Sequence, residues 1–265
     1  ASEAPVPAEP VELKVWHDGD EAIMQTIADT VNPMLADSGV SLVFEKRTGL
    51  SDQLKLYGGD AANGPDMYFY AHDSLGTFAA MDILAPLTDL VDESTWAGDL
   101  EMTVEAGQIG GVQYLLPVYF ETLLFMYNRR YMQDEQVPAT TEELYAYMEA
   151  NTGRGRYGFV EQHSTAYYSA AWIHGFGGSI VSEDGTPFPE PEAVKEALRY
   201  HLKFVALMPG ETEYSTVNTL FLEGKADSTI GGPWMVPSAR EAGIDLGIAP
   251  MPTVDELSLI HISEP

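Results

Sequence analysis

The sequence contains no cysteine, which excludes disulfide bonds, thiolate chemistry and cysteine-based zinc sites. Basic residues are scarce: 13 lysines and arginines stand against 41 aspartates and glutamates, so the formal net charge is −28. A nucleic-acid partner needs a basic surface, and this chain does not supply one. No apolar run approaches the roughly 20 residues of a membrane-spanning helix. What remains is an acidic protein that repels anionic ligands over most of its surface.

Common catalytic motifs are also missing. The sequence has no Gly-x-Ser-x-Gly elbow, no His-Glu-x-x-His and no phosphate-binding loop with its lysine. His17 and His72 both follow expected strands, but a metal site needs three or four converging ligands. Asp20, Asp73 and Glu121 are candidates for the paired carboxylates of a glycosidase, although 41 acidic residues make such a set uninformative. We therefore predict no catalytic residue, no metal and no cofactor.

The composition itself is that of a folded protein. Hydrophobic residues make up 45% of the 265 positions and charged residues 20%, which suits one large or two medium domains. Residues 1–10 carry three prolines and are predicted to form a flexible tail.

Strands and helices are expected to alternate in the first half of the chain, which predicts a largely parallel sheet. The apolar periodicity predicts strands over 13–17, 41–47 and 66–70, and helices over 22–35, 50–57 and 72–81.

The second half of the sequence carries signals for the beginnings and ends of helices and strands. Gly110 and Gly111 predict a hairpin or bend, and Thr140 with Glu143 predicts a capped helix start. A strand over 156–160 is a further expectation. Helices are expected over 167–174, 191–207 and 217–222, and strands within 226–234 and 245–252.

Polar side chains follow the first and third expected strands. Asp18 and Asp20 come after the first strand, and His72 and Asp73 after the third. Ligands of open parallel sheets bind outside the carboxyl ends of the strands. These residues therefore mark either a ligand site or ordinary solvated strand ends.

Aromatic residues accompany these polar groups. An aromatic ring can pack on the apolar face of a sugar, whose hydroxyl rim suits carboxylate acceptors. We interpret Trp16 and Trp172 as core residues. For Tyr70, Tyr167 and Trp234, each beside a turn or a polar stretch, core and ligand-binding roles both stay open. Carboxylates and aromatics without lysine or arginine favour a neutral polyol over a phosphate.

Five segments, in this order, resemble the maltose- and maltodextrin-binding protein family, the carbohydrate receptors of ABC importers. They are LKVWHDGD, GPDMYFYAHDSLG followed by LAPL, GGVQYLLPVYFETLLFMYNRRYM, YSTVNTLFLEGKADSTIGGPWMV and LGIAPMPT.

The resemblance implies an α/β, periplasmic-binding-protein-like fold with two lobes, a hinge and a central cleft. It implies lobes over 11–120 and 121–254, with the cleft closing on an oligosaccharide of the maltodextrin class. The implied partners are that sugar and the permease subunits of the importer. The implied receptor is a monomer, periplasmic or extracellular, and a lipid anchor at its N-terminus is left open.

The resemblance also implies which residues bind. Asp18, Asp20 and Asp73 would accept sugar hydroxyls, and Glu121 would do so near the hinge; Tyr70, Tyr167 and Trp234 would stack on sugar rings. The chain departs from the family at Glu21, Ser74 and Thr165, where many members carry a lysine, a basic residue and a glutamate. These departures leave the exact sugar open.

Two expectations concern the whole chain. Family members are longer, and the ending LSLIHISEP resembles read-through of a sequencing adapter, so we expect a truncated frame with a non-native tail over 255–265.

The alternative function is a secreted glycan-active hydrolase using Asp73 and Glu121, and a polypeptide-binding module is a third hypothesis.

Overall fold

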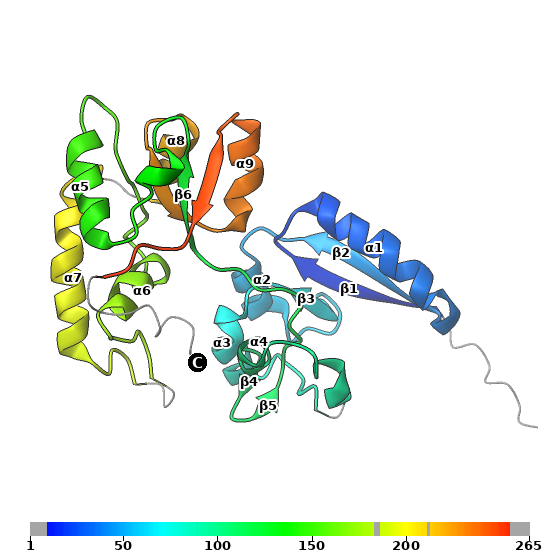
Figure 1. Ribbon diagram of the computed structural model, residues 1–265. Coiled ribbons are helices and arrows are strands. Elements are labelled where there is room, and N and C mark those ends of the chain that lie inside the picture. Colours follow the sequence, from blue (N-terminus) through cyan, green and yellow to red (C-terminus); the bar gives the residue numbers. More distant parts are fainter. Residues whose placement is uncertain (1–9, 89, 183–185, 211–212, 255–265) are drawn as a thin grey trace, which may run out of the picture. The chain divides into compact units, whose positions relative to one another are not determined.

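The computed structural model describes residues 10–88, 90–182, 186–210 and 213–254. These residues fall into two units, one ending at Phe120 and the other beginning at Glu121 (Figure 1). Each unit is described by itself. The tail expected over 255–265 lies outside the described residues, as does most of the tail expected over 1–10.

Unit 1 is built on a three-stranded parallel sheet. Its strands are β1 (Val11–His17), β2 (Val40–Lys46) and β3 (Met67–Phe69), in the order β2-β1-β3. The register pairs His17 with Lys46 on one side and with Phe69 on the other. The parallel sheet expected for this half is therefore confirmed, and all three strands end at the same edge.

A helix follows each of these strands, as the periodicity predicted. They are α1 (Glu21–Leu35), α2 (Leu50–Tyr57) and α3 (Leu75–Ala80), the last preceded by a 3-10 turn over His72–Ser74. Burial of Trp16, Leu50, Leu54 and Phe78 forms the apolar core beneath the sheet edge.

The rest of unit 1 contains α4 (Glu101–Glu105) and a hairpin of β4 (Gln108–Ile109) and β5 (Val112–Gln113). Its turn is Gly110-Gly111, with φ of 58° and 78°. Positive φ at both central residues is what a tight hairpin turn requires, and glycine adopts it without a steric penalty. The expected hairpin is confirmed.

Unit 2 contains a sheet of a different kind. Its strands are β6 (Leu124–Asn128), β7 (Ser228–Gly231) and β8 (Leu246–Ala249), in the order β7-β6-β8. Central β6 runs antiparallel to both neighbours. The parallel prediction concerned only the first half of the chain, and unit 2 differs from it because the central strand runs opposite to both neighbours.

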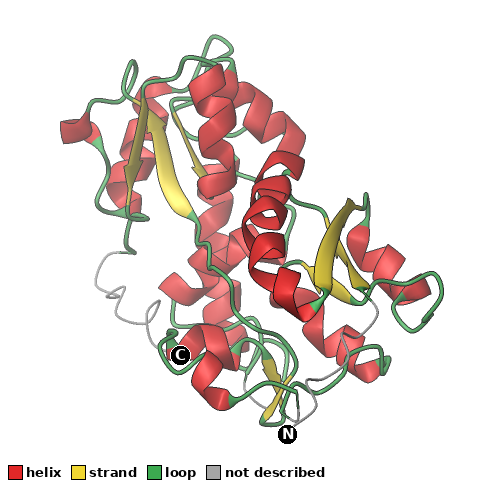
Figure 2. Cartoon of the chain, turned by 90° about the vertical axis from the view of Figure 1, so that its right-hand side faces the viewer, coloured by secondary structure: helices red, strands yellow, loops and turns green. Residues whose placement is uncertain are grey.

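Five helices of unit 2 surround this sheet, and Figure 2 shows helices beside the strands of both units. They are α5 (Thr141–Asn151), α6 (Ala166–Gly175), α7 (Pro191–Val205), α8 (Tyr214–Leu222) and α9 (Val236–Glu241). Thr140 and Glu143 form the predicted capping box at the start of α5. The remaining 3-10 turns in the described residues are Ala36–Ser38, Glu93–Thr95, Asp134–Gln136 and Pro233–Met235.

The segment 156–160 is not a continuous strand, contrary to expectation. It makes isolated parallel bridges, from Tyr157 to Ala226 and from Val160 to Thr229. The segment thus runs alongside β7 in the same direction, and Val160 lies opposite the second residue of that strand. Within the described part of the chain, no helix is long and apolar enough to cross a membrane.

Candidate functional site

The carboxyl edge of the unit 1 sheet gathers an aromatic ring and carboxylates. Asp18 directly follows β1 and Tyr70 directly follows β3, and the pairing of His17 with Phe69 makes them neighbours across the edge. Partial burial raises the pKa of Tyr70, and the negative charges of Asp18, Asp73 and Asp52 raise it further. The structure therefore brings Asp18, Tyr70 and Asp73 together and adds Asp52 from α2.

Tyr70 is half-buried, and it packs against the core cluster of Trp16, Leu50, Leu54 and Phe78. This packing limits the rotamers of the ring, while part of its surface stays accessible. Asp18 and Asp73 are both exposed, and Ser74 Oγ lies 3.5 Å from an Asp73 oxygen. A pre-positioned ring bordered by solvent-accessible acceptors suits a ligand with an apolar face and a hydroxyl rim.

Asp20 has a structural task that the sequence reading did not assign to it. It is the N-cap of α1, and its Oδ1 accepts hydrogen bonds from the backbone N–H groups of Ala22 at 2.8 Å and Ile23 at 3.1 Å. One carboxylate oxygen is therefore already committed to the helix. Asp20 remains an exposed candidate ligand, with less acceptor capacity than Asp18 or Asp73.

Cationic residues at this edge were missed by the sequence reading. Lys46 ends β2 and Arg47 follows it, and parallel pairing places both at the edge where β1 ends. The Arg47 guanidinium lies 4.3 Å from the centre of the Trp16 ring and pairs with Glu45 at 2.5 Å. The edge is therefore not free of basic residues, although the Arg47 charge is balanced by Glu45. The two basic letters that close SLVFEKR were the available signal.

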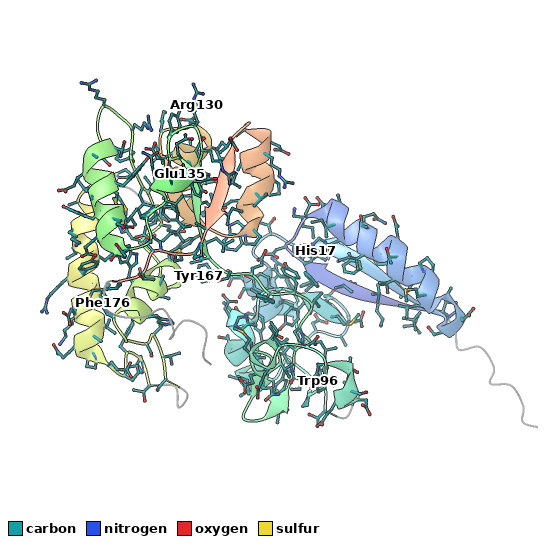
Figure 3. All side chains as sticks on the ribbon, in the orientation of Figure 1. His17, Trp96, Arg130, Glu135, Tyr167 and Phe176 are labelled. Atoms are coloured by element: carbon teal, nitrogen blue, oxygen red, sulfur yellow. The ribbon has the colours of Figure 1, made fainter. Side chains whose placement is uncertain are left out.

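Unit 2 has a corresponding edge, where β7 and β8 end and β6 begins. Glu121 precedes β6 by three residues, and α6 begins shortly after the segment that ends beside β7. Tyr167, near the start of α6, is 54% exposed (Figure 3). Partial burial of its hydroxyl raises the pKa of Tyr167, and the charge of Glu121 raises it further. The structure thus brings Glu121 and Tyr167 together.

Trp234 follows the end of β7 at the same edge. It is half-buried and packs against the cluster of Met126, Phe221 and Met235. Its indole also covers Gly232, where an added Cβ would lie 2.0 Å from the ring. Gly232 is therefore required for the observed position of the indole, which leaves part of the ring accessible.

The other aromatic residues fall into a buried group and an exposed group. Trp16 and Trp172 are 2% and 5% exposed, which confirms that both belong to the core. Tyr168 is also buried, whereas Tyr119 is exposed, with its ring centre 5.9 Å from that of Phe69. His17 is buried beside Phe44, and among the described residues no group of three His, Cys, Asp or Glu side chains could hold a metal ion.

Two α/β units with candidate groups at the strand ends define the class of the molecule. The fold is that of the periplasmic-binding-protein-like class, as in a solved cyclo/maltodextrin-binding protein complexed with maltotetraose. That structure matches with a TM-score of 0.77 and 29% identity, over 94% of this chain and 66% of that one. The family model described as bacterial extracellular solute-binding protein matches residues 31–263. The chain belongs to that family.

Curated relatives extend the comparison. A maltotriose-binding protein of Pyrococcus abyssi is 30% identical over 91% of this chain and 53% of its own length. A galactooligosaccharide-binding protein of Bacillus subtilis is 29% identical over 92% of this chain and 60% of its own length. The chain therefore spans little more than half the length of these relatives. Such relatives are binding proteins rather than enzymes.

Proposed function

We propose that this chain is the sugar-binding part of a receptor for a carbohydrate ABC importer, and that it takes neutral oligosaccharides of the maltodextrin class. The observation that carries the proposal is the group at the carboxyl edge of unit 1, where Asp18 and Asp73 border the Tyr70 ring. Maltotriose and maltotetraose in the names of similar proteins favour an α-glucan as the ligand.

The chemistry of the ligand follows from these groups. A pyranose ring has an apolar face that packs on an aromatic ring, and carboxylates accept its hydroxyl hydrogens. Tyr70 would provide the ring in unit 1, with Asp18 and Asp73 as acceptors and Asp20 contributing its remaining oxygen. Glu121, Tyr167 and Trp234 would serve the same ligand from unit 2. The charge of −28 disfavours phosphorylated or acidic sugars.

The partners and location of the receptor follow the same proposal. The loaded protein would deliver its sugar to the permease subunits of an ABC importer, on the outer face of the membrane. We propose a monomer in the periplasm or outside the cell. A lipid anchor is a feature of some relatives, which are described as solute-binding lipoproteins.

Thermal unfolding with and without sugar tests this function. A ligand that binds only the folded state stabilises it by about 2.7 kcal/mol at one hundred times its Kd. We expect maltotriose to raise the Tm. A galactooligosaccharide is measured in parallel, because it represents the other sugar class named among the relatives. No stabilisation by any neutral oligosaccharide would contradict the proposal.

Recovering the ligand after incubation distinguishes a binding protein from the alternative, a hydrolase. Prolonged incubation with labelled maltodextrin should return the sugar intact. Shortened products that disappear in Asp73→Asn or Glu121→Gln would support the enzyme instead.

A further inference from the structure

Unit 2 buries a carboxylate just behind its candidate site. Glu161 directly follows Val160, whose parallel bridge to Thr229 places this segment beside β7. The Glu161 side chain is 0% exposed. The indole Nε1–H of Trp172 donates to its two oxygens at 2.9 and 3.2 Å, and His201 Nε2 is hydrogen-bonded to Oε1. Glu161 is therefore buried away from any ligand, yet its partner Trp172 belongs to the same helix as the candidate residue Tyr167.

The three members of this group, Glu161, Trp172 and His201, come from three segments. Trp172 belongs to α6 and His201 to α7, and their rings stack with centres 4.5 Å apart and an angle of 19°. Trp172 lies on the same short helix as Tyr167. Any rotation or shift of α6 about the Trp172 contact therefore moves Tyr167 as well.

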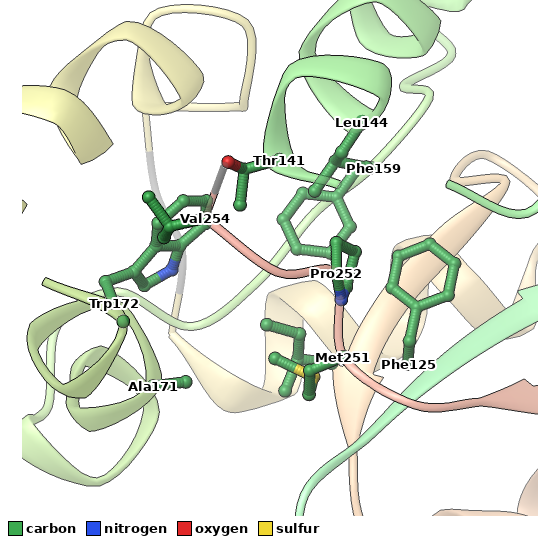
Figure 4. A pocket seen from close by; sticks show the side chains of 11 residues that line it. Phe125, Thr141, Leu144, Phe159, Ala171, Trp172, Met251, Pro252 and Val254 are labelled. Atoms are coloured by element: carbon green, nitrogen blue, oxygen red, sulfur yellow. The ribbon is translucent and has the colours of Figure 1, made fainter. Parts of the chain in front are cut away.

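Apolar side chains pack α6 into unit 2, since Tyr168, Trp172 and Ile173 are buried. A small apolar cavity of about 30 Å³ lies along the helix (Figure 4). Ala171, Trp172 and Gly175 line it from α6, and Figure 4 shows the Trp172 and Phe125 rings on opposite sides. Because this cavity is small, it removes only a few of the contacts that fix this face of the helix. The first turn of α6 also has no side-chain cap.

We infer that the Glu161–Trp172–His201 cluster positions α6, and thereby sets how tightly Tyr167 engages the sugar. These are positioning residues, because they act through the helix and do not contact the ligand. The inference rests on the proposed function for its effect on affinity. Its structural half, that the cluster restrains α6, does not depend on any ligand.

A purely structural role makes a different prediction. A buried hydrogen bond that only stabilises the fold changes the free energy of unfolding, and leaves the affinity of the folded fraction unchanged. A positioning role changes the affinity at temperatures where every variant is folded. The two are separated by measuring Kd well below each Tm.

Three variants address the cluster. Glu161→Leu leaves the Trp172 N–H without its acceptor, and Trp172→Phe removes that donor while keeping an aromatic ring, which covers the case that Glu161→Leu does not fold. Glu161→Gln is the conservative variant: its amide oxygen can accept from Trp172, and its NH₂ can donate to His201 in the Nδ1–H tautomer.

The chain offers a matched control. Asp227 is another carboxylate with 0% exposure, and Tyr147 Oη donates to it at 3.0 Å. Tyr147→Phe removes that donor from α5, just as Trp172→Phe removes a donor from Glu161. The Tyr147→Phe variant loses a comparable buried hydrogen bond and leaves the residues of α6 unchanged.

Amide hydrogen exchange of α6 in the sugar-free protein is the first readout, and maltotriose Kd by calorimetry the second. We expect Glu161→Leu and Trp172→Phe to speed α6 exchange about tenfold and weaken Kd about tenfold, a change of about 1.4 kcal/mol each. Glu161→Gln should restore both values to within about threefold of the unaltered chain, and Tyr147→Phe should change neither.

Unchanged α6 exchange in Glu161→Leu or Trp172→Phe would overturn the inference, and so would an equal effect of Tyr147→Phe. Faster exchange with unchanged Kd would overturn the link to affinity. Failure of the unaltered chain to bind maltotriose would count against the proposed function, and the exchange rates would still decide whether the cluster restrains α6.

Discussion

Tyr70 combines a fixed ring with nearby negative charge. Its half-buried side chain packs against the core cluster beneath the sheet edge, while Asp18 and Asp73 lie close enough to raise its pKa. Packing restricts the ring before any ligand arrives, so less side-chain entropy is lost on binding. The exposed carboxylates keep their acceptor capacity for the ligand. This arrangement is why we assign the largest contribution in unit 1 to these three residues.

Replacing Asp73 by asparagine should weaken maltotriose binding about tenfold, or about 1.4 kcal/mol, because a charge-assisted hydrogen bond becomes a neutral one. Calorimetric titration measures this change. Asp99→Asn is the control, since Asp99 is an exposed aspartate elsewhere in unit 1. Equal affinities for Asp73→Asn and Asp99→Asn would remove Asp73 from the site.

Tyr68 gives a prediction about alkaline pH. Burial raises the pKa of Tyr68 to about 12, and its hydroxyl has no hydrogen-bond partner among the described residues. In the unfolded chain the pKa is about 10, so the folded state holds its proton more tightly. The resulting stability is complete below about pH 10 and is lost as the pH rises towards 12.

Tyr68→Phe should therefore unfold less readily than the unaltered chain at high pH, with an advantage that grows from about pH 10 upward. Below that range it should match or slightly exceed the parent, because an unpartnered buried hydroxyl is removed. Urea denaturation across this pH range measures the difference. An advantage that stays constant with pH would show that Tyr68 does not titrate as described.

Residues at strand ends could be predicted from the sequence, whereas residues that arrive through other elements could not. Asp18, Tyr70 and Asp73 follow β1 and β3 directly, so parallel pairing is enough to make them neighbours. Asp52 reaches Tyr70 from α2 through packing that no local pattern encodes, whereas Arg47 directly follows β2 and could have been placed at the edge by parallel pairing.

At the scale of elements, local sequence signals predicted the structure well, whereas the pairing of distant strands could not be predicted. The capping box of α5, the Gly-Gly hairpin and the parallel sheet of unit 1 follow from short-range rules and were confirmed. The sheet of unit 2 pairs β6 with strands about a hundred residues further along the chain. Alternation of strands and helices says nothing about the direction of such distant partners, so the sequence made no prediction of strand direction for unit 2.

Gly232 supports a prediction about the end of β7. A Cβ at this position would lie 2.0 Å from the Trp234 indole, so Gly232→Ala must displace the ring. We expect a lower Tm, a changed near-ultraviolet circular dichroism signal and a weaker maltotriose Kd, at a cost of about 1–3 kcal/mol for the forced displacement. Gly210→Ala is the control, because an added Cβ there meets nothing within 4 Å. Unchanged affinity in Gly232→Ala would argue against a role for Trp234.

At the scale of the whole molecule, the excess of negative charge is the main feature that affects stability. A net charge of −28 on 265 residues repels itself, and salt screens that repulsion. We expect the Tm to rise by several degrees between low salt and about 1 M, where the Debye length is about 3 Å. The affinity for a neutral sugar should change little over the same range. A Tm that falls with salt would mean that attractive ion pairs outweigh the repulsion.

The central claim is that the chain binds a neutral maltodextrin through the group around Tyr70, and calorimetric titration of maltotriose tests it most directly. The pair to compare is the unaltered chain and Tyr70→Ala, with Asp99→Asn as the control. The account predicts saturable binding by the unaltered chain and by Asp99→Asn, and at least tenfold weaker binding by Tyr70→Ala, because the platform for the sugar ring is gone. No heat of binding in the unaltered chain, or an affinity unaffected by the loss of Tyr70, would contradict it.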